Sequence, residues 1–380
     1  MQPSLRSTLS RREFTKLIAA GTITPELLMP NHDPTSARLA DPTWAGYDRA
    51  VVLDCLASPG PFNVANATAA PLTATMLANA GKSGITAVNL TVSAGTFDQT
   101  FAQMGYWERE LTAHADQLTQ VRSVADIRAA KQSRRLGLIY GFQNATMLEG
   151  EVANVEVFYN FGVRIIQLTY NDRNLLGDGC LEPANAGLSR YGREVVARMN
   201  ALGMLVDLSH CGVQTTADAI AASSKPVAVT HSGCRAVFDH PRSKRDEELR
   251  ALANKGGVIG IYLMPFINAS GQPRSEHVIA QIEYAVKVCG EDHVGIGSDL
   301  SITPHVVTPE YVAAHRAFGL ERQRRGIGAP REEELLFVAD MNSERRMEMI
   351  ADHLLARGHS EGRVEKIVGG NWMRVFSEVW

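Results

Sequence analysis

Short apolar runs rich in β-branched residues recur along the chain from about Arg49 onward, and amphipathic stretches separate them. Such runs predict strands, and several are apolar throughout, as expected where both faces of a parallel sheet are covered. Eight strands are predicted: Ala50 to Leu56, Gly84 to Thr91, Leu136 to Phe142, Val163 to Thr169, Met204 to Leu208, Val227 to Thr230, Gly257 to Tyr262 and Val294 to Gly297. Predicted helices between them include Gly192 to Ala201, Thr215 to Ala222, Asp246 to Lys255 and His277 to Cys289.

Strand and helix units repeated in this way indicate the α/β class. An open doubly wound sheet usually stops at five or six strands, so eight units favour a closed (β/α)8 TIM barrel. In such a barrel the chemistry lies at the carboxyl ends of the strands. The polar residues that follow each predicted strand are therefore the candidates for function.

Composition limits the classes of partner. The chain has 380 residues, of which 45% are hydrophobic and 21% charged, and its formal net charge is -3. This balance offers no broad positive field for nucleic acid, and we expect a small neutral or zwitterionic partner. No apolar run approaches the length of a transmembrane segment. The five cysteines are widely spaced, contain no CxxC pair and are expected to be small core residues: Cys55, Cys180, Cys211, Cys234 and Cys289.

The first forty residues have a different character. Arg11 and Arg12 precede the mildly apolar stretch Leu17 to Gly21, an order that resembles a twin-arginine export signal. We therefore expect residues 1–40 to be a signal and linker, residues 41–380 to form a single barrel domain, and the protein to be periplasmic or secreted. The alternative is a basic, frayed N-terminus on a cytoplasmic protein.

Three metal-capable residues follow three predicted strands. His210 and His231 come after the fifth and sixth strands, and Asp299 comes after the eighth. Two imidazoles and a carboxylate suit zinc or a similar divalent ion, and Asp299 is also the candidate base that takes a proton from water. Each residue also has an ordinary structural explanation: a histidine bonded within a loop or the core, or an aspartate that caps a helix.

Two further groups are candidates for substrate binding. Arg242 lies in a basic turn after the sixth strand, and its planar guanidinium suits a carboxylate, although such a turn can also be a solvated surface. The fourth strand ends in a polar, glycine-broken loop that begins with Tyr170 and Asn171. That loop is either a substrate wall or an ordinary surface loop.

Together these stretches resemble the membrane (renal) dipeptidases of peptidase family M19, from about Val51 to Phe376. The resemblance implies a zinc-dependent barrel that hydrolyses dipeptides, and a homodimer. It makes His210 and His231 ligands of one zinc, and Asp299 a ligand of the other and the base. Arg242 then binds the terminal carboxylate of the substrate. Tyr170 stands where many members have a substrate-contacting histidine, and its hydroxyl can still donate to a carbonyl or an oxyanion.

The chain departs from that family at three ligand positions. Leu56 and Ser58 replace the family's His-x-Asp pair, and Gln143 replaces the bridging glutamate. A neutral amide is a weak ligand and cannot balance the charge of a dication, so we expect one zinc ion or none. No spacing in the sequence indicates that other nearby residues replace these ligands.

The leading hypothesis is a metallo-dipeptidase that cleaves a dipeptide or a related small amide with a reduced site. The first alternative is a catalytically silent relative that binds a peptide or a peptide-derived metabolite. The second keeps the fold and tailors a peptide natural product. Metal content and turnover distinguish them.

Overall fold

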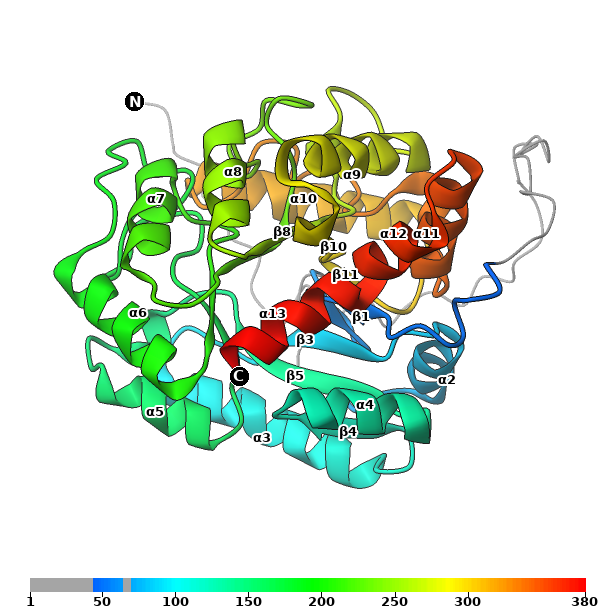
Figure 1. Cartoon of the computed structure of the whole chain (residues 1–380), viewed down its shortest axis with the longest axis horizontal. Helices are drawn as coiled ribbons and strands as arrows, with labels where there is room; N and C mark the ends of the chain where they lie inside the picture. The colour runs from blue at the N-terminus through cyan, green and yellow to red at the C-terminus, as the bar shows by residue number, and fades with distance from the viewer. Residues whose placement is uncertain (1–43, 64–69) are drawn as a thin grey trace, which may run out of the picture. The chain divides into compact units, whose positions relative to one another are not determined.

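The computed structural model describes residues 44–63 and 70–380, and its centre is a nearly closed barrel of parallel strands (Figure 1). In order around the barrel these are β1 (Leu53–Asp54), β3 (Ala87–Thr91), β5 (Leu136–Phe142), β6 (Ile165–Gln167), β7 (Leu205–Asp207), β8 (Ala228–Ser232), β9 (Val258–Ile261) and β10 (Val294–Ile296). Each of the eight predicted strands coincides with one of them, and the TIM-barrel fold is confirmed. The predicted signal and linker lie outside the described residues.

Helices alternate with these strands and surround the barrel. They are α2 (Ala74–Lys82), α3 (Phe97–Ala113), α4 (Val124–Ser133), α5 (Ala153–Asn160), α6 (Arg190–Leu202), α7 (Val213–Ala222), α8 (Asp246–Asn254), α9 (Ser275–Cys289), α10 (Pro309–Arg324), α11 (Arg346–Ala356), α12 (Glu361–Glu365) and α13 (Asn371–Val379). Several begin at a hydroxyl that accepts a hydrogen bond from a backbone N–H three residues later, as at Thr96, Ser123 and Ser189. Within the described part of the chain, no helix has the length and apolar character to cross a membrane.

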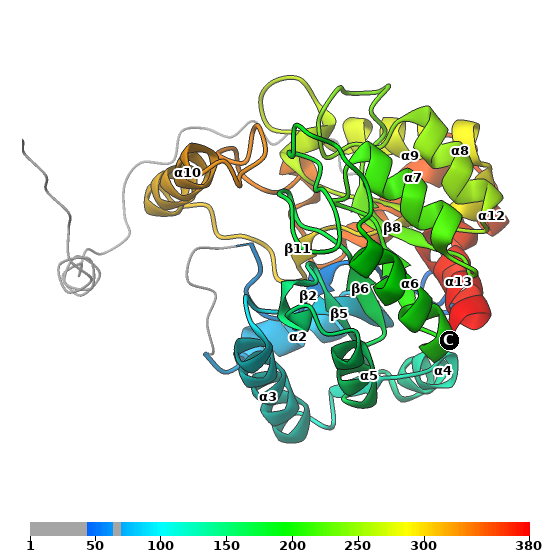
Figure 2. The ribbon, with the colours of Figure 1, turned by 90° about the vertical axis from the view of Figure 1, so that its left-hand side faces the viewer.

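Three short strands were not predicted. β4 (Leu118–Val121) pairs with β5 and lies off the strand order of the barrel, while β2 (Ala57–Ser58) pairs with β11 (Leu300–Ser301) in a separate two-stranded sheet. β4 contains the polar residues Thr119 and Gln120, and β2 and β11 are two-residue segments that each include a serine, so none of the three forms an apolar run that a sequence pattern can identify. α10 belongs to a long excursion between β11 and α11, and Figure 2 shows it standing apart from the helices that surround the barrel.

A buried carboxylate joins the first and last strands of the barrel. Asp54, fully buried in β1, accepts hydrogen bonds from the backbone N–H of Ser298 at 2.7 Å and from its hydroxyl at 2.5 Å. The guanidinium of Arg346, 2% exposed, lies 3.5 Å from the same carboxylate. Burial raises the pKa of Asp54, and Arg346 opposes that rise. This group of side chains fixes the residues that lead from β10 to Asp299.

α13 covers the end of the barrel at which the strands begin. Figure 1 shows α13 running across the strands. Its buried side chains Trp372, Val375, Phe376 and Val379 form one apolar cluster with residues of the strands. The indole Nε1 of Trp372 donates to the carbonyl of Ile296 at 3.1 Å. The carboxyl ends of the strands, where the sequence predicts the site residues, lie at the other end of the barrel.

We expect Arg346→Leu to lower the free energy of unfolding by about 3–5 kcal/mol, because it leaves the carboxylate of Asp54 buried without a counter-charge. Denaturant unfolding measures the loss. The double variant Asp54→Asn/Arg346→Leu should be less destabilised than Arg346→Leu alone. Equal stability of Arg346→Leu and the unmodified protein would show that the ion pair of Asp54 and Arg346 does not stabilise the contact between the first and last strands.

Candidate functional site

The candidate residues gather at the carboxyl rim of the barrel. His210 follows β7, His231 lies within β8, and Asp299 follows β10, while Tyr170 and Arg242 come from the loops after β6 and β8. His210, His231 and Asp299 are at most 4% exposed, and Arg242 is 3% exposed. The structure thus buries all four around the mouth of the barrel.

A bulge in β8 determines the position of His231. The register between β8 and β9 shifts between Val229 and Ser232, so that Thr230 and His231 occupy the space of one residue. Glycines on the neighbouring strands make this possible: a Cβ at Gly260 or Gly297 would lie 2.0 or 1.9 Å from the carbonyl oxygen of Thr230. Only glycine leaves room for that carbonyl.

A hydrogen-bond chain starting at Asp207 orients the ring of His231. The carboxylate accepts from the hydroxyls of Ser209 at 2.5 Å and Thr230 at 2.7 Å, and also from their backbone N–H groups. Burial raises the pKa of Asp207, and these four donors oppose the rise. Because the Thr230 hydroxyl donates to Asp207, it accepts from His231 Nδ1 at 2.9 Å. We therefore assign the His231 proton to Nδ1.

Asn171 orients the ring of His210 through a hydrogen bond to its Nδ1. Its amide nitrogen donates to the carbonyl of Ile327 at 2.8 Å, which leaves its oxygen to accept from His210 Nδ1 at 2.7 Å. His210 Nε2 and His231 Nε2 lie 3.0 Å apart. With both protons on Nδ1, the two Nε2 lone pairs face one another, and only a shared cation or proton makes that arrangement favourable.

Both imidazoles are in the form that binds metal ions. Burial, reinforced by the nearby positive charge of Arg242, holds the pKa of His210 and of His231 well below the usual value for histidine. Neutral rings whose Nδ1–H groups are already bonded resemble the histidine ligands of metal sites, where a second partner fixes the tautomer.

Asp299 sits apart from the histidine pair in a strained backbone conformation. Its φ is 63°, in the left-handed region, and its carboxylate accepts from the amide of Asn63 at 3.1 Å. Burial raises the pKa of Asp299 to about 7, against the opposing effects of Arg242 and Asn63. A carboxyl group with this pKa can gain or lose a proton near neutral pH.

Asp299 faces a cavity of about 90 Å³ whose walls come from the rim and from the excursion that contains α10. Ten residues line it: Asn63, Tyr170, Arg242, Met264, Phe266, Asp299, Phe318, Arg322, Glu332 and Leu336. The only hydrogen bond that the Arg242 side chain donates within the described residues goes to the carbonyl of His231 at 3.5 Å, and its buried Nε has no partner there. A buried guanidinium with unused donors is suited to an anionic group of a ligand.

Tyr170 lies over the histidine pair. Its ring stacks on His210 with centroids 4.1 Å apart and planes at 23°, and its hydroxyl accepts a long hydrogen bond of 3.5 Å from Arg322. Burial raises the pKa of Tyr170 to about 12, so the hydroxyl keeps its proton. Tyr170 lines the cavity whereas His210 and His231 do not. Asn171, predicted to contact substrate, uses both ends of its amide within the protein.

The donor set does not fit the two-zinc site implied by the resemblance. Leu56 has no ligand atom in its side chain, the hydroxyl of Ser58 accepts from Gly60 N–H at 3.1 Å, and Gln143 is a neutral amide. The carboxylate of Asp54 already binds Ser298 and Arg346 where the first and last strands meet. Among residues 44–63 and 70–380, no three His, Cys, Asp or Glu side chains form a group that could hold a metal ion. What remains is a pair of imidazoles, two ligands for one ion.

Two charged residues of the cavity were missed. Arg322 on α10 forms an ion pair with Glu332 at 2.8 Å, and both line the cavity beside Tyr170. Their sequence context is a charged stretch typical of a solvated helix face, with no strand before it. The supporting role of Asp207 was also missed, although its spacing from Ser209 and His210 is a signal that could have indicated it.

Comparisons with known proteins bear on the family and the fold of the chain. Residues 72–328 match the family model described as membrane dipeptidase (peptidase family M19). The solved structure of an amidohydrolase from Pseudomonas aeruginosa is 33% identical, covers 88% of this chain and 98% of its own, and superposes with a TM-score of 0.77.

Curated relatives are more distant. An uncharacterised protein encoded in the pqqA 5′ region of Klebsiella pneumoniae is 28% identical over 72% of this chain and 93% of its own length. The dipeptidase verJ of Clonostachys rogersoniana is 27% identical over 74% of this chain, which spans 65% of that protein.

We expect Thr230→Val to lower the free energy of unfolding by about 1–3 kcal/mol, because His231 Nδ1 loses its acceptor and Asp207 loses a donor in a buried site. Denaturant unfolding measures the change. Thr112→Val is the matched control: its hydroxyl bonds the carbonyl of Glu108 on an exposed helix face, and we expect a change within about 0.5 kcal/mol. Equal effects of the two substitutions would contradict the proposed network.

Proposed function

The chain belongs to the membrane dipeptidase family, peptidase family M19, and we propose that it is a dipeptidase-like hydrolase of a small peptide or related amide with a site reduced to one metal ion. The observation that carries this proposal is the pair of buried imidazoles whose Nε2 atoms lie 3.0 Å apart while each Nδ1 is bonded within the protein. Relatives such as verJ are named dipeptidases, which supports the substrate class.

His210 and His231 are the residues that would hold the ion. Zinc bound there would supply Lewis-acid polarisation of the scissile carbonyl. Asn171 and the Thr230–Asp207 chain keep the two nitrogens aimed at the same point, so the site needs little reorganisation on binding. The positions of Leu56, Ser58 and Gln143 provide no support for a second ion.

The cavity supports recognition of a small substrate with a free carboxylate. The buried guanidinium of Arg242 binds that carboxylate, in the role implied by the family. The hydroxyl of Tyr170 donates to the substrate carbonyl from the wall between the cavity and His210. Apolar side chains such as Phe318 and Leu336 exclude water from the remaining wall.

Asp299 moves the proton in this proposal. In its ionised form it accepts a proton from the attacking water, and it then returns that proton to the leaving amine. Arg242 and Asn63 favour the ionised form, and burial opposes it. The resulting pKa of about 7 lets one group act as acceptor and then donor at neutral pH.

A second candidate function is binding or tailoring of a peptide-derived metabolite without peptide hydrolysis. Two features favour it: the ring of Tyr170 stacks on His210 and lines the cavity, and Leu56, Ser58 and Gln143, where the resemblance implies ligands, offer no strong ligand atom. In that case Arg242 and the cavity remain the binding site, and the histidine pair is a structural remnant.

We also propose that residues 1–40 form a twin-arginine signal and linker before a single domain of residues 41–380, and that the protein acts in the periplasm or outside the cell. The order of Arg11 and Arg12 before an apolar stretch supports this.

Metal content and turnover on one sample decide between the two functions. We expect protein purified without chelators to contain about one zinc per chain, and to hydrolyse members of a panel of L,L and L,D dipeptides. His210→Ala and His231→Ala should each lose the metal and the activity. His353→Ala, which removes a partly buried histidine of α11, should retain both.

Elemental analysis and a ninhydrin assay of released amino acids give the two readouts. Absence of zinc and of turnover after zinc addition, together with calorimetric binding of a dipeptide, would replace the hydrolase proposal with the binding function. Two zinc ions per chain would contradict the reduced site.

The pH profile tests Asp299. We expect kcat/KM to rise with pH through about 7, because the pKa of Asp299 is raised to about 7 and only its ionised form accepts a proton. Asp299→Asn should lower kcat by about 10²- to 10⁴-fold and remove this rise. The control Asp292→Asn alters an exposed carboxylate and should keep the profile. An Asp299→Asn protein with full activity would remove Asp299 from the mechanism.

A further inference from the structure

A second cavity lies at the opposite end of the barrel from the candidate site. Its volume is about 410 Å³, and it is bounded by the C-terminal ends of α2 and α4 and by the beginnings of β3 and β5. In a (β/α)8 barrel these ends form the face away from the catalytic rim. The cavity is thus independent of the proposed hydrolase site.

The charge of this cavity is unbalanced. Lys131, Arg134 and Arg135 line it together with a single acidic residue, Asp48, which gives a net charge of +2 among its described lining residues. Across residues 44–63 and 70–380, no carboxylate oxygen lies within 4.0 Å of the side-chain nitrogens of these three basic residues. Arg135 donates to the hydroxyl of Ser133 and the carbonyl of Ala115, both uncharged.

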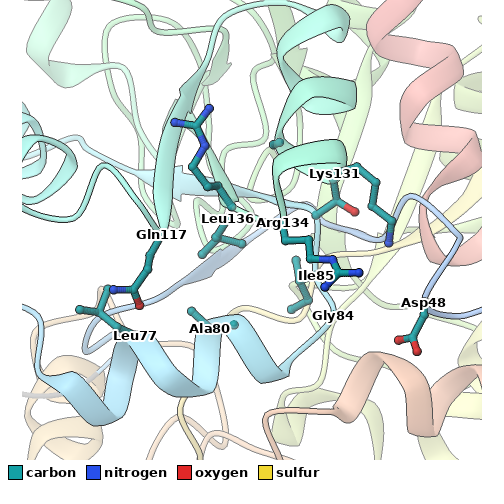
Figure 3. A pocket seen from close by; sticks show the side chains of 13 residues that line it. Asp48, Leu77, Ala80, Gly84, Ile85, Gln117, Lys131, Arg134 and Leu136 are labelled. Atoms are coloured by element: carbon teal, nitrogen blue, oxygen red, sulfur yellow. The ribbon is translucent and has the colours of Figure 1, made fainter.

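The opposite wall is apolar. Leu77, Ile85 and Leu136 line the cavity, and Figure 3 shows Lys131 and Arg134 extending from the end of α4 near Ile85, with Leu77 farther along α2. Lys131 is partly buried, and burial lowers the pKa of its ammonium group. A partly buried cation beside an apolar wall is suited to a ligand that has an anionic group and an apolar body.

The backbone at Arg134 adopts a conformation that favours glycine. Arg134 is the C-cap of α4, with φ 55° and ψ 32° in the left-handed region, where glycine is the favoured residue. An arginine there is less favourable for the fold than a glycine would be. Basic residues at a helix C-terminus also complement the helix dipole, but that role requires neither a cavity nor this strained position.

We propose that this cavity is a binding site for a small amphipathic anion, a phosphate ester or carboxylate with an apolar body, held by Lys131 and Arg134 against the wall formed by Leu77, Ile85 and Leu136. The site is separate from the dipeptidase-like site, and its occupation requires neither metal nor catalysis. Ligand bound there contacts α2 and α4 together and stabilises the folded chain.

Calorimetric titration of the full chain with phenyl phosphate tests the proposal. We expect a dissociation constant of about 1 mM or lower, and binding at least about tenfold weaker for inorganic phosphate and for phenol. Lys131→Met and Arg134→Gly should each weaken binding of phenyl phosphate by about tenfold or more. Arg134→Gly should keep or raise the melting temperature, because glycine relieves the backbone, and so lost binding cannot be ascribed to misfolding.

Two controls locate the binding. Arg190→Met removes a charge from a side chain that is 95% exposed on α6, and should leave the affinity unchanged. Arg242→Met removes the anion-binding group of the candidate site, and should also leave it unchanged. Absence of binding to the unmodified protein would overturn the proposal, as would an affinity in Lys131→Met or Arg134→Gly equal to that of the unmodified protein. Loss of binding in Arg242→Met would also overturn it. Equal affinity for inorganic phosphate would overturn the role of the apolar wall.

Discussion

A buried carboxylate lies where the barrel closes, beside the backbone hydrogen bond from Cys55 N–H to the carbonyl of Ile296 at 3.0 Å. β1 and β10 are the ends of the strand order, and Asp54 joins them through Ser298 and Arg346. The backbone N–H of Asp299 then bonds the carbonyl of Leu56 at 2.8 Å, which holds the candidate base against the first strand. The position of Asp299 in the cavity therefore follows from the way the barrel closes.

The two halves of the rim differ in whether their residues can bind a metal ion. β7 and β8 keep a complete support for two imidazoles, from Asp207 through Thr230 and from Asn171. The segments that follow β1 and β5 supply Leu56, Ser58 and Gln143, which cannot bind a dication strongly. The cavity instead takes Arg322 and Glu332 from the excursion around α10. The site is thus a family scaffold with local chemistry of its own.

Much of this arrangement follows from sequence patterns. The eight barrel strands are long enough, or apolar enough, to be recognised, and they place His210, His231 and Asp299 at one rim. The bulge in β8 depends instead on glycines in two other strands, and the cavity depends on a helix with no strand before it. Contacts between distant segments of this kind leave no local periodicity. The stacking of Tyr170 on His210 likewise depends on how distant segments pack, which no local pattern in the sequence predicts.

The hydrogen-bond chain from Asp207 to His231 has a consequence for how this lineage can change. His231 Nδ1 is bound to the hydroxyl of Thr230, and the bulge that aims the ring also fits Gly260 and Gly297. Folding alone therefore constrains the residue at this position, whatever becomes of catalysis. A descendant that abandoned metal chemistry would shed the exchangeable residues of the first and third barrel strands long before it lost the imidazoles. The hydrogen bonds at Nδ1 thus hold the two imidazoles in the fold independently of any metal ion.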